Sequence, residues 1–165
     1  MIVRWSKIAM VLSLAAFALV VTFDNLIDYG SNFEFVRHVL SMDTTFPGHA
    51  LMGRAITSPG AWHAAYVAII AGEGVTAVLL ALGAYELWMA RRRSSVAFQA
   101  AKRFAVAGCT VGFMVWFFGF MVVGGEWFAM WQSKAWNGQE SAFRFYMALL
   151  GVLVFVNQAD GEPGA

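Results

Sequence analysis

The sequence GGEWFAMWQSKAWNGQESAFR, residues 124–144, decides the class of fold because it lies between two long apolar runs. Three of the seven tryptophans fall in it, Trp127, Trp131 and Trp136, among Glu, Gln, Asn, Lys and Arg side chains. Aromatic rings mixed with polar groups between apolar segments are typical of a membrane–water boundary. We therefore interpret the chain as a small membrane protein that crosses the bilayer several times, with this stretch at its surface.

The composition favours lipid as the solvent of this chain. Of the 165 residues, 60% are hydrophobic and 13% are charged, whereas soluble domains are about 45–50% apolar and about 25% charged. The formal net charge of +1 gives no indication of a nucleic-acid partner. The single cysteine, Cys109, excludes an intrachain disulfide. Because polar loop residues are few, residues 1–165 are expected to form a single membrane domain.

Four apolar runs predict an all-α, four-transmembrane-helix bundle, because a helix satisfies its own backbone hydrogen bonds in lipid. The spans are expected near residues 5–26, 61–89, 104–123 and 142–158, each close to the ~20 residues that cross a bilayer. In the connector after the first span, apolar residues recur at helical spacing, which predicts a short amphipathic helix from Asn32 to Met42. The tail, residues 159–165, is acidic and rich in Gly and Pro, and is expected to fray.

The basic residues predict the orientation. They divide seven to four between the two sides of such a bundle: Arg4, Lys7, Arg91, Arg92, Arg93, Lys102 and Arg103 against Arg37, Arg54, Lys134 and Arg144. The side with more Lys and Arg is the cytoplasmic one under the positive-inside rule. Both termini are therefore expected in the cytoplasm, with the first connector and residues 124–144 on the outer side. Trp127 and Trp131 are one helical turn apart and are expected to continue the third span.

Glu73 is the residue with the clearest functional potential, because it lies near the middle of the second span between Gly72 and Gly74. An ionised carboxylate at that depth costs about 2.5–3.5 kcal/mol on insertion scales. It therefore indicates a proton relay, an ion site or a partner for a positive group; the alternative is a protonated Glu that is hydrogen-bonded to a neighbouring helix. Asp24, Asp28 and Glu126 are expected to form an acidic rim on the outer side.

Other kinds of chemistry have weaker support. Only His63 begins a span among the three histidines, so a haem with two His ligands is not expected. The loop spacing of the three histidines permits a metal site, but there is no HxxxH or Cys/His signature. There is also no recognisable nucleophile with a base and no phosphate-binding Gly loop. We expect no enzyme activity, cofactor or metal. Aromatic rows at residues 116–120 and 143–146 could line a quinone or lipid site, or could fill the bundle. Helix packing is expected at three small residues: Gly108, Gly112 and Gly119.

Two motifs carry a resemblance to a known family. They are NFEFVRHVLSMDTTFP, residues 32–47, and EWFAMWQS with WNGQ, residues 126–139, followed by Phe143-Arg144. The chain resembles a bacterial family of predicted small integral membrane proteins of unknown function. The resemblance covers nearly the whole chain and implies four spans in a bacterial inner membrane. It implies no activity and no catalytic residue.

These observations favour a non-catalytic accessory subunit that lies in the bilayer and binds a larger inner-membrane complex, such as a respiratory complex. Its expected docking surface joins the two motifs through Phe35, His38, Asp43, Glu126, Trp127, Trp131, Trp136 and Arg144. The alternative is a small transporter or a proton- or ion-handling protein that uses Glu73 and the acidic rim. Whether the two motifs pack on each other or on a partner stays open from the sequence.

Overall fold

The computed structural model describes residues 1–162, which form helices and connecting loops with no strand in that range. Four helical segments are long and apolar enough to cross a membrane. In chain order the helices are α1 (Ile2–Ile27), α2 (Tyr29–Ser41), η1 (Ala50–Arg54), α3 (Pro59–Ala90), α4 (Ser95–Ala100), α5 (Arg103–Phe113), η2 (Met114–Trp127), η3 (Met130–Gln132) and α6 (Gln139–Asn157). The predicted all-α bundle with four spans is confirmed, and each helical segment is longer than the predicted span.

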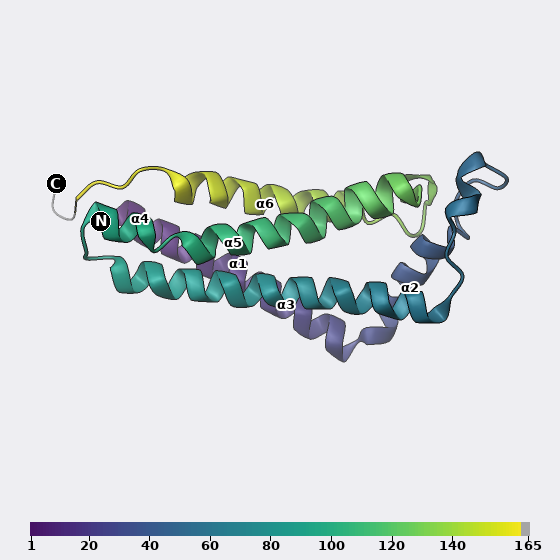
Figure 1. Ribbon diagram of the computed structural model, residues 1–165, viewed down its shortest axis with the longest axis horizontal. Helices are drawn as coiled ribbons and strands as arrows, with labels where there is room; N and C mark the ends of the chain where they lie inside the picture. The colour runs from purple at the N-terminus through teal and green to yellow at the C-terminus, as the bar shows by residue number, and fades with distance from the viewer. Residues whose placement is uncertain (163–165) are drawn as a thin grey trace.

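Figure 1 shows the long helices side by side, with both chain termini and α4 at one end of the bundle. We call this the terminal end. The opposite end carries α2 with the loop around η1, and the loop between η2 and α6. We call these two segments, residues 29–58 and 127–138, the cap. The fold therefore has two distinct ends joined by a packed helical shaft.

The first connector is mostly folded, because its helix begins directly after the first span. α1 ends at Ile27, and Asp28 (φ −106°, ψ 54°) breaks the helix before α2 starts at Tyr29. α2 ends at Ser41, because the φ of the next residue, Met42, is 54°, in the left-handed region that cannot continue a helix. The predicted helix from Asn32 to Met42 is thus confirmed, with its start three residues earlier and its end one residue earlier.

The third span differs from the prediction at both ends. The expected connector before Lys102 contains the short helix α4, whose N-terminus is capped by the Ser94 hydroxyl accepting from the Ala97 backbone N–H. Beyond Phe113 the chain continues as a π-helix, η2, and the Phe128 N–H still bonds five residues back to Val123. The helix then stops at Trp127, because Ala129 takes a left-handed φ of 53°. The expectation that one helix would include Trp131 is therefore wrong.

Two apolar cores hold the bundle together. The larger lies between α1, α3, α5 and α6, where Val11, Leu80 and Leu87 are fully buried. The smaller joins the cap to the first half of α3 through Leu40, Met42 and other residues. Large apolar side chains are exposed along the outside of the shaft, as a lipid-facing surface requires. They include Leu12, Leu19, Val78, Leu82 and Val154.

The terminal end is tied together by buried cations. Lys7 donates from Nζ to the Gln158 carbonyl (2.7 Å) and to Asp160 Oδ1 (2.9 Å). Lys102 Nζ donates to the same carbonyl (2.8 Å) and lies 2.5 Å from Asp160 Oδ2. Arg4 reaches the carbonyls of Arg93 (2.6 Å) and of the tail (2.8 Å). These cations thus neutralise the negative carbonyl ends of α3 and α6.

The C-terminal tail is therefore ordered through Glu162, and the expectation that it frays is wrong for residues 159–162. Burial would raise the pKa of the Asp160 carboxyl, but hydrogen bonds and charge from Lys102 and Lys7 hold that pKa below its usual range. Glu162 accepts from the Ser95 backbone N–H (3.2 Å) and from its hydroxyl. Its pKa is also lowered, mainly by those bonds. Residues 163–165 lie outside the described part of the chain.

Candidate functional site

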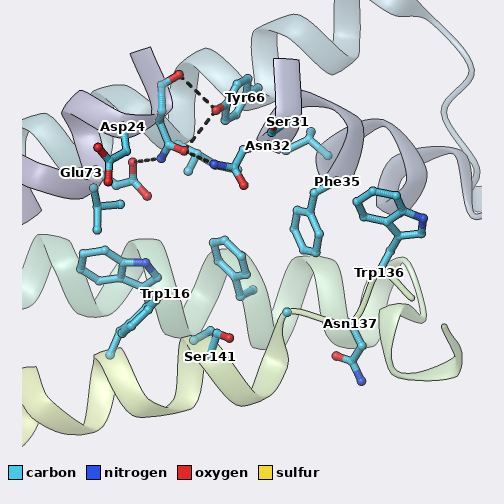
Figure 2. Close-up of a pocket in the computed structure, with 18 of the residues that line it drawn as sticks. Asp24, Ser31, Asn32, Phe35, Tyr66, Glu73, Trp116, Trp136, Asn137 and Ser141 are labelled. Carbon is cyan, nitrogen blue, oxygen red and sulfur yellow. Dashed lines mark hydrogen bonds between the residues drawn. The ribbon is translucent and has the colours of Figure 1, made fainter. Parts of the chain in front are cut away.

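A cleft of about 510 Å³ lies where the shaft meets the cap, between α1, α2, α3, η2 and the start of α6. Figure 2 shows side chains from these elements pointing toward one another across it. Its lining includes Asp24, Asn25, Asn32, Phe35, Tyr66, Glu73, Trp116, Phe120, Trp136 and Phe145. The volume is within the range of about 300–1,000 Å³ that is usual for small-molecule sites.

Glu73 lies in the wall of this cleft and is 2% exposed. Its Oε2 accepts a hydrogen bond of 2.7 Å from Asn25 Nδ2, across 48 residues of sequence. Asn25 Oδ1 accepts in turn from Asn32 Nδ2 (2.6 Å) and from the Tyr66 hydroxyl (3.2 Å). The dashed lines in Figure 2 trace this network. A buried carboxyl is thus held by an amide that two further donors fix in place.

Glu73 lies near the middle of α3, 14 residues after Pro59 and 17 residues before Ala90. Trp62 and Trp88, near the two ends of that helix, are 11 and 15 residues away from it. Its partner Asn25 lies two residues before Ile27, the last residue of α1.

Five further aromatic rings line the cleft, and they come from four segments of the chain: Phe35, Trp116, Phe120, Trp136 and Phe145. Phe35 of α2 stacks on Phe120 with ring centroids 5.9 Å apart. Trp116 meets Phe145 edge to face at 5.7 Å. Trp116 and Phe120 both belong to the π-helix η2, a type of helix that often occurs at functional sites. Part of both predicted aromatic rows therefore lines a cavity, and Trp116 and Phe145 also pack in the larger apolar core.

The charge of the cleft is one-sided. Asp24 and Glu73 line it, and among the described residues no Lys, Arg or His does. Of the predicted acidic rim, only Asp24 reaches the cleft; Asp28 and Glu126 are exposed elsewhere. The sequence therefore identified the carboxylates at this end of the bundle but overestimated how many of them line the same site.

The two sequence motifs pack on each other in the cap, which answers the question that the sequence left open. Trp136 stacks on His38 at 4.6 Å, with the ring planes 16° apart. The Thr44 hydroxyl donates to the Ser133 hydroxyl at 2.9 Å. The Phe46 backbone N–H donates to Gln132 Oε1 at 3.0 Å. Because Trp136 belongs to the cap and also lines the cleft, these contacts hold the cap over one side of the cleft.

His38 is fixed by two charged neighbours. Arg37 can only donate, so its contact of 2.9 Å with His38 Nε2 makes that nitrogen the acceptor. The proton of the neutral ring is then on Nδ1, which donates to the Asp43 carboxylate at 2.8 Å. Arg37 and Asp43 together orient the His38 imidazole against the Trp136 ring. It belongs to the outer surface of the cap and not to the cleft.

The remaining predicted docking residues lie on the cap or beside it. The Arg54 guanidinium stacks over Trp127 at 4.5 Å and donates to the Trp127 carbonyl at 3.1 Å. Trp131 is half exposed and meets Phe46 edge to face at 6.0 Å. Arg144 is exposed on α6, where it pairs with Glu140. Phe46, Trp127 and Trp131 thus expose aromatic rings on the cap.

The three histidines are dispersed. His49 Nδ1 accepts from the Leu51 N–H at the start of η1 (3.3 Å), and His63 Nδ1 lies 2.8 Å from the Tyr29 hydroxyl. Across residues 1–162, no group of three or more His, Cys, Asp or Glu side chains is arranged to hold a metal ion. The described residues thus offer no metal centre at this end.

Glycines set the approach of α3 to α5. A Cβ on Gly83 would lie 2.5 Å from the Ala105 backbone nitrogen, and one on Gly108 would lie 2.9 Å from that of Leu80. Gly112 has Thr76 and Leu149 side chains within 3 Å of the same position. Gly119 meets only a carbonyl of its own helix, at 3.9 Å. The sequence did not identify Gly83, because its contact depends on the rotation of α3 toward α5.

The model of a family described as "Predicted small integral membrane protein (DUF2165)" matches residues 3–159. No curated protein and no solved structure matches the chain.

Proposed function

The chain belongs to this family of predicted small integral membrane proteins, and we propose that it is a non-catalytic membrane protein that binds a small ligand in the Glu73 cleft. The observation that carries the proposal is a buried carboxyl in the wall of an aromatic cavity. Ionisable groups in membrane spans are retained mainly for function, because lipid disfavours them. The network of Asn25, Asn32 and Tyr66 holds this one in a fixed position, as a binding site requires.

The packing on the terminal side of the cleft favours binding over passage through the bundle. Leu80 and Leu87 are fully buried there, and the glycines of α3 and α5 bring the helix backbones into contact. A transporter or ion-handling protein with this fold would use the cleft as its outward-open site. It would then have to separate α3 from α5 during each cycle. Binding from the cap side needs no such movement.

Native mass spectrometry of the protein in nanodiscs tests the binding proposal. We expect wild-type protein to carry a bound small molecule, and Glu73→Gln to lose it. Gln keeps an oxygen that can accept from Asn25, so the variant changes the charge with little change of shape. The matched control is Asp28→Asn, which removes an exposed carboxylate outside the cleft. Equal retention by Glu73→Gln, or no bound molecule on wild-type protein, would reject the proposal.

A second candidate function is an accessory subunit of a larger membrane complex, such as a respiratory complex. Its support is the aromatic surface of the cap, where Phe46, Trp127 and Trp131 are each at least 50% exposed. Trp is enriched in the energetic centres of protein interfaces. We expect Trp131→Ala to release partner proteins that co-purify with the wild type in mild detergent. Isolation of the wild type alone, or only with copies of itself, would contradict this function.

We also propose a bacterial inner-membrane location with both termini in the cytoplasm. The support is charge: Arg4, Lys7, the Arg91–Arg93 run, Lys102 and Arg103 lie at or beside the terminal end. Labelling of single engineered cysteines with a membrane-impermeant maleimide tests this orientation, and buried Cys109 gives a low background. A cysteine at Phe46 should label in intact cells, and one at Ser95 only after lysis. The reverse pattern would place the cap inside.

A further inference from the structure

We infer that the ligand of the cleft is an organic ammonium ion, that is, a protonated amine on an apolar or aromatic body. This inference rests on the proposed binding function and specifies the chemistry of the same site. Three independent features of the cleft carry it: its charge, the direction of its hydrogen bonds and the nature of its walls.

The charge of the cleft favours a positive occupant. Asp24 and Glu73 both line it, and the lining contains no Lys, Arg or His among the described residues. The buried Glu73 carboxyl loses hydration when it is ionised, and the exposed Asp24 adds a second negative charge to the same lining. A cation beside Glu73 offsets the lost hydration, because it supplies an opposite charge at short range. An anionic ligand would meet repulsion without compensation.

The hydrogen bonds favour a ligand that donates. Asn25 directs its amide to Glu73, and Asn32 and Tyr66 direct their donors to the Asn25 oxygen. The donors of this network are thus turned toward one another. A carboxylate has about four acceptor positions, and the Glu73 carboxylate uses one of them on Oε2 for Asn25. Within this network, the Glu73 carboxylate therefore keeps acceptor positions for a ligand, which suit the N–H groups of an ammonium ion.

The walls favour an organic cation over a metal ion. Figure 2 shows Trp116 on the opposite side of the cleft from Asp24 and Glu73. A cation between them would contact carboxylate oxygens on one side and an indole face on the other. Aromatic faces attract organic cations, with Trp the strongest. The rings of Phe120, Phe145 and Phe35 then cover the apolar body of the ligand. A metal ion would need more oxygen ligands than this site offers.

A matched series of ligands with one aromatic body tests the inference by calorimetric titration of the protein in nanodiscs at neutral pH. The series is phenethylamine, phenethyltrimethylammonium, phenethyl alcohol and phenylpropionate. We expect phenethylamine to bind at least about tenfold more tightly than the alcohol, because its hydrogen bond to carboxylate is charge-assisted. The trimethylammonium compound should lie between them, since it keeps the charge and lacks N–H donors. Phenylpropionate should not bind.

Variants of the two carboxylates assign the effect to the cleft. Glu73→Gln and Asp24→Asn should each lower the affinity for phenethylamine about tenfold and leave that for the alcohol unchanged. Asp28→Asn, one helical turn from Asp24 and outside the cleft, should leave both affinities unchanged. Equal affinity of the wild type for amine and alcohol, or no binding of any compound, would overturn the ammonium assignment. A ligand that co-purifies with the wild type and depends on Glu73 would still support the binding function in that case.

Discussion

The contact between α3 and α5 at Gly83 gives the most direct quantitative test of this fold. Replacing Gly83 by Ala places a Cβ 2.5 Å from the nitrogen, 2.8 Å from the Cα and 2.9 Å from the Cβ of Ala105. All three atoms belong to the backbone or are fixed to it, so no side-chain rotation relieves the overlap. The helices must move apart, and the cost of such overpacking is about 1–3 kcal/mol.

Gly151→Ala is the matched control, because a Cβ at this position of α6 meets no atom within 4 Å. Both substitutions occur inside a helix, so both carry the same gain in helix propensity, up to about 1 kcal/mol. The difference between the two variants therefore isolates the helix contact. We expect Gly83→Ala to be less stable than Gly151→Ala by about 1–3 kcal/mol.

The assay is unfolding by SDS in mixed micelles, followed by far-ultraviolet circular dichroism, with free energies compared at a common detergent fraction. Stabilities of the two variants that agree within about 0.5 kcal/mol would refute the reasoning, since that is the usual effect of a surface substitution. α3 and α5 would then not approach each other at Gly83 as described. The measurement does not depend on any ligand, so it tests the fold separately from the function.

Three further substitutions test the two ends of the molecule by the same unfolding assay. Asp160→Asn should lower the free energy of unfolding by about 3 kcal/mol at neutral pH. Because folding lowers the pKa of the Asp160 carboxyl, this loss of stability should shrink as the pH falls below about 4. A loss of stability that is independent of pH would contradict the ion pair. Asn25→Ala removes the donor to Glu73 and should destabilise by about 1–3 kcal/mol; an unchanged stability would show that the bond contributes nothing. Ser133→Ala leaves the Thr44 hydroxyl and a backbone N–H without their acceptor in the cap and should cost about 1–3 kcal/mol, whereas a neutral result would mean that water replaces the hydroxyl.

Most of the fold followed from local sequence, and the candidate site followed only in part. Glu73 is recognisable because a carboxyl inside an apolar run is unusual whatever surrounds it. Its partner Asn25 looked like one of several polar residues at the end of a span, and Tyr66 like an ordinary aromatic residue. A cluster of polar groups at residues 24–28 gave a signal, but it did not indicate which of them would turn toward α3.

The tail and the cap show the same limit. Residues 159–162 have the composition of a frayed end, yet Lys7 and Lys102 bind them because the bundle brings three chain segments together there. The aromatic residues of positions 116–145 look alike in sequence. Only the π-helical register of η2 and the turn at Ala129 decide that Trp116 and Trp136 line the cleft while Trp127 and Trp131 face outward.

The sequence by itself determined that the chain lies in a lipid bilayer, how many spans it has and roughly where each span begins and ends. These properties depend on hydropathy summed over about 20 neighbouring residues. It also identified Glu73, since the cost of a carboxyl in lipid is a local property. Only the tertiary structure decided which side chains meet. The rotation and offset of each helix bring Asn25 to Glu73 across 48 residues and Gly83 to Ala105. The rotation and offset of each helix depend on how all the helices pack together, so they cannot be read from the sequence of any single segment.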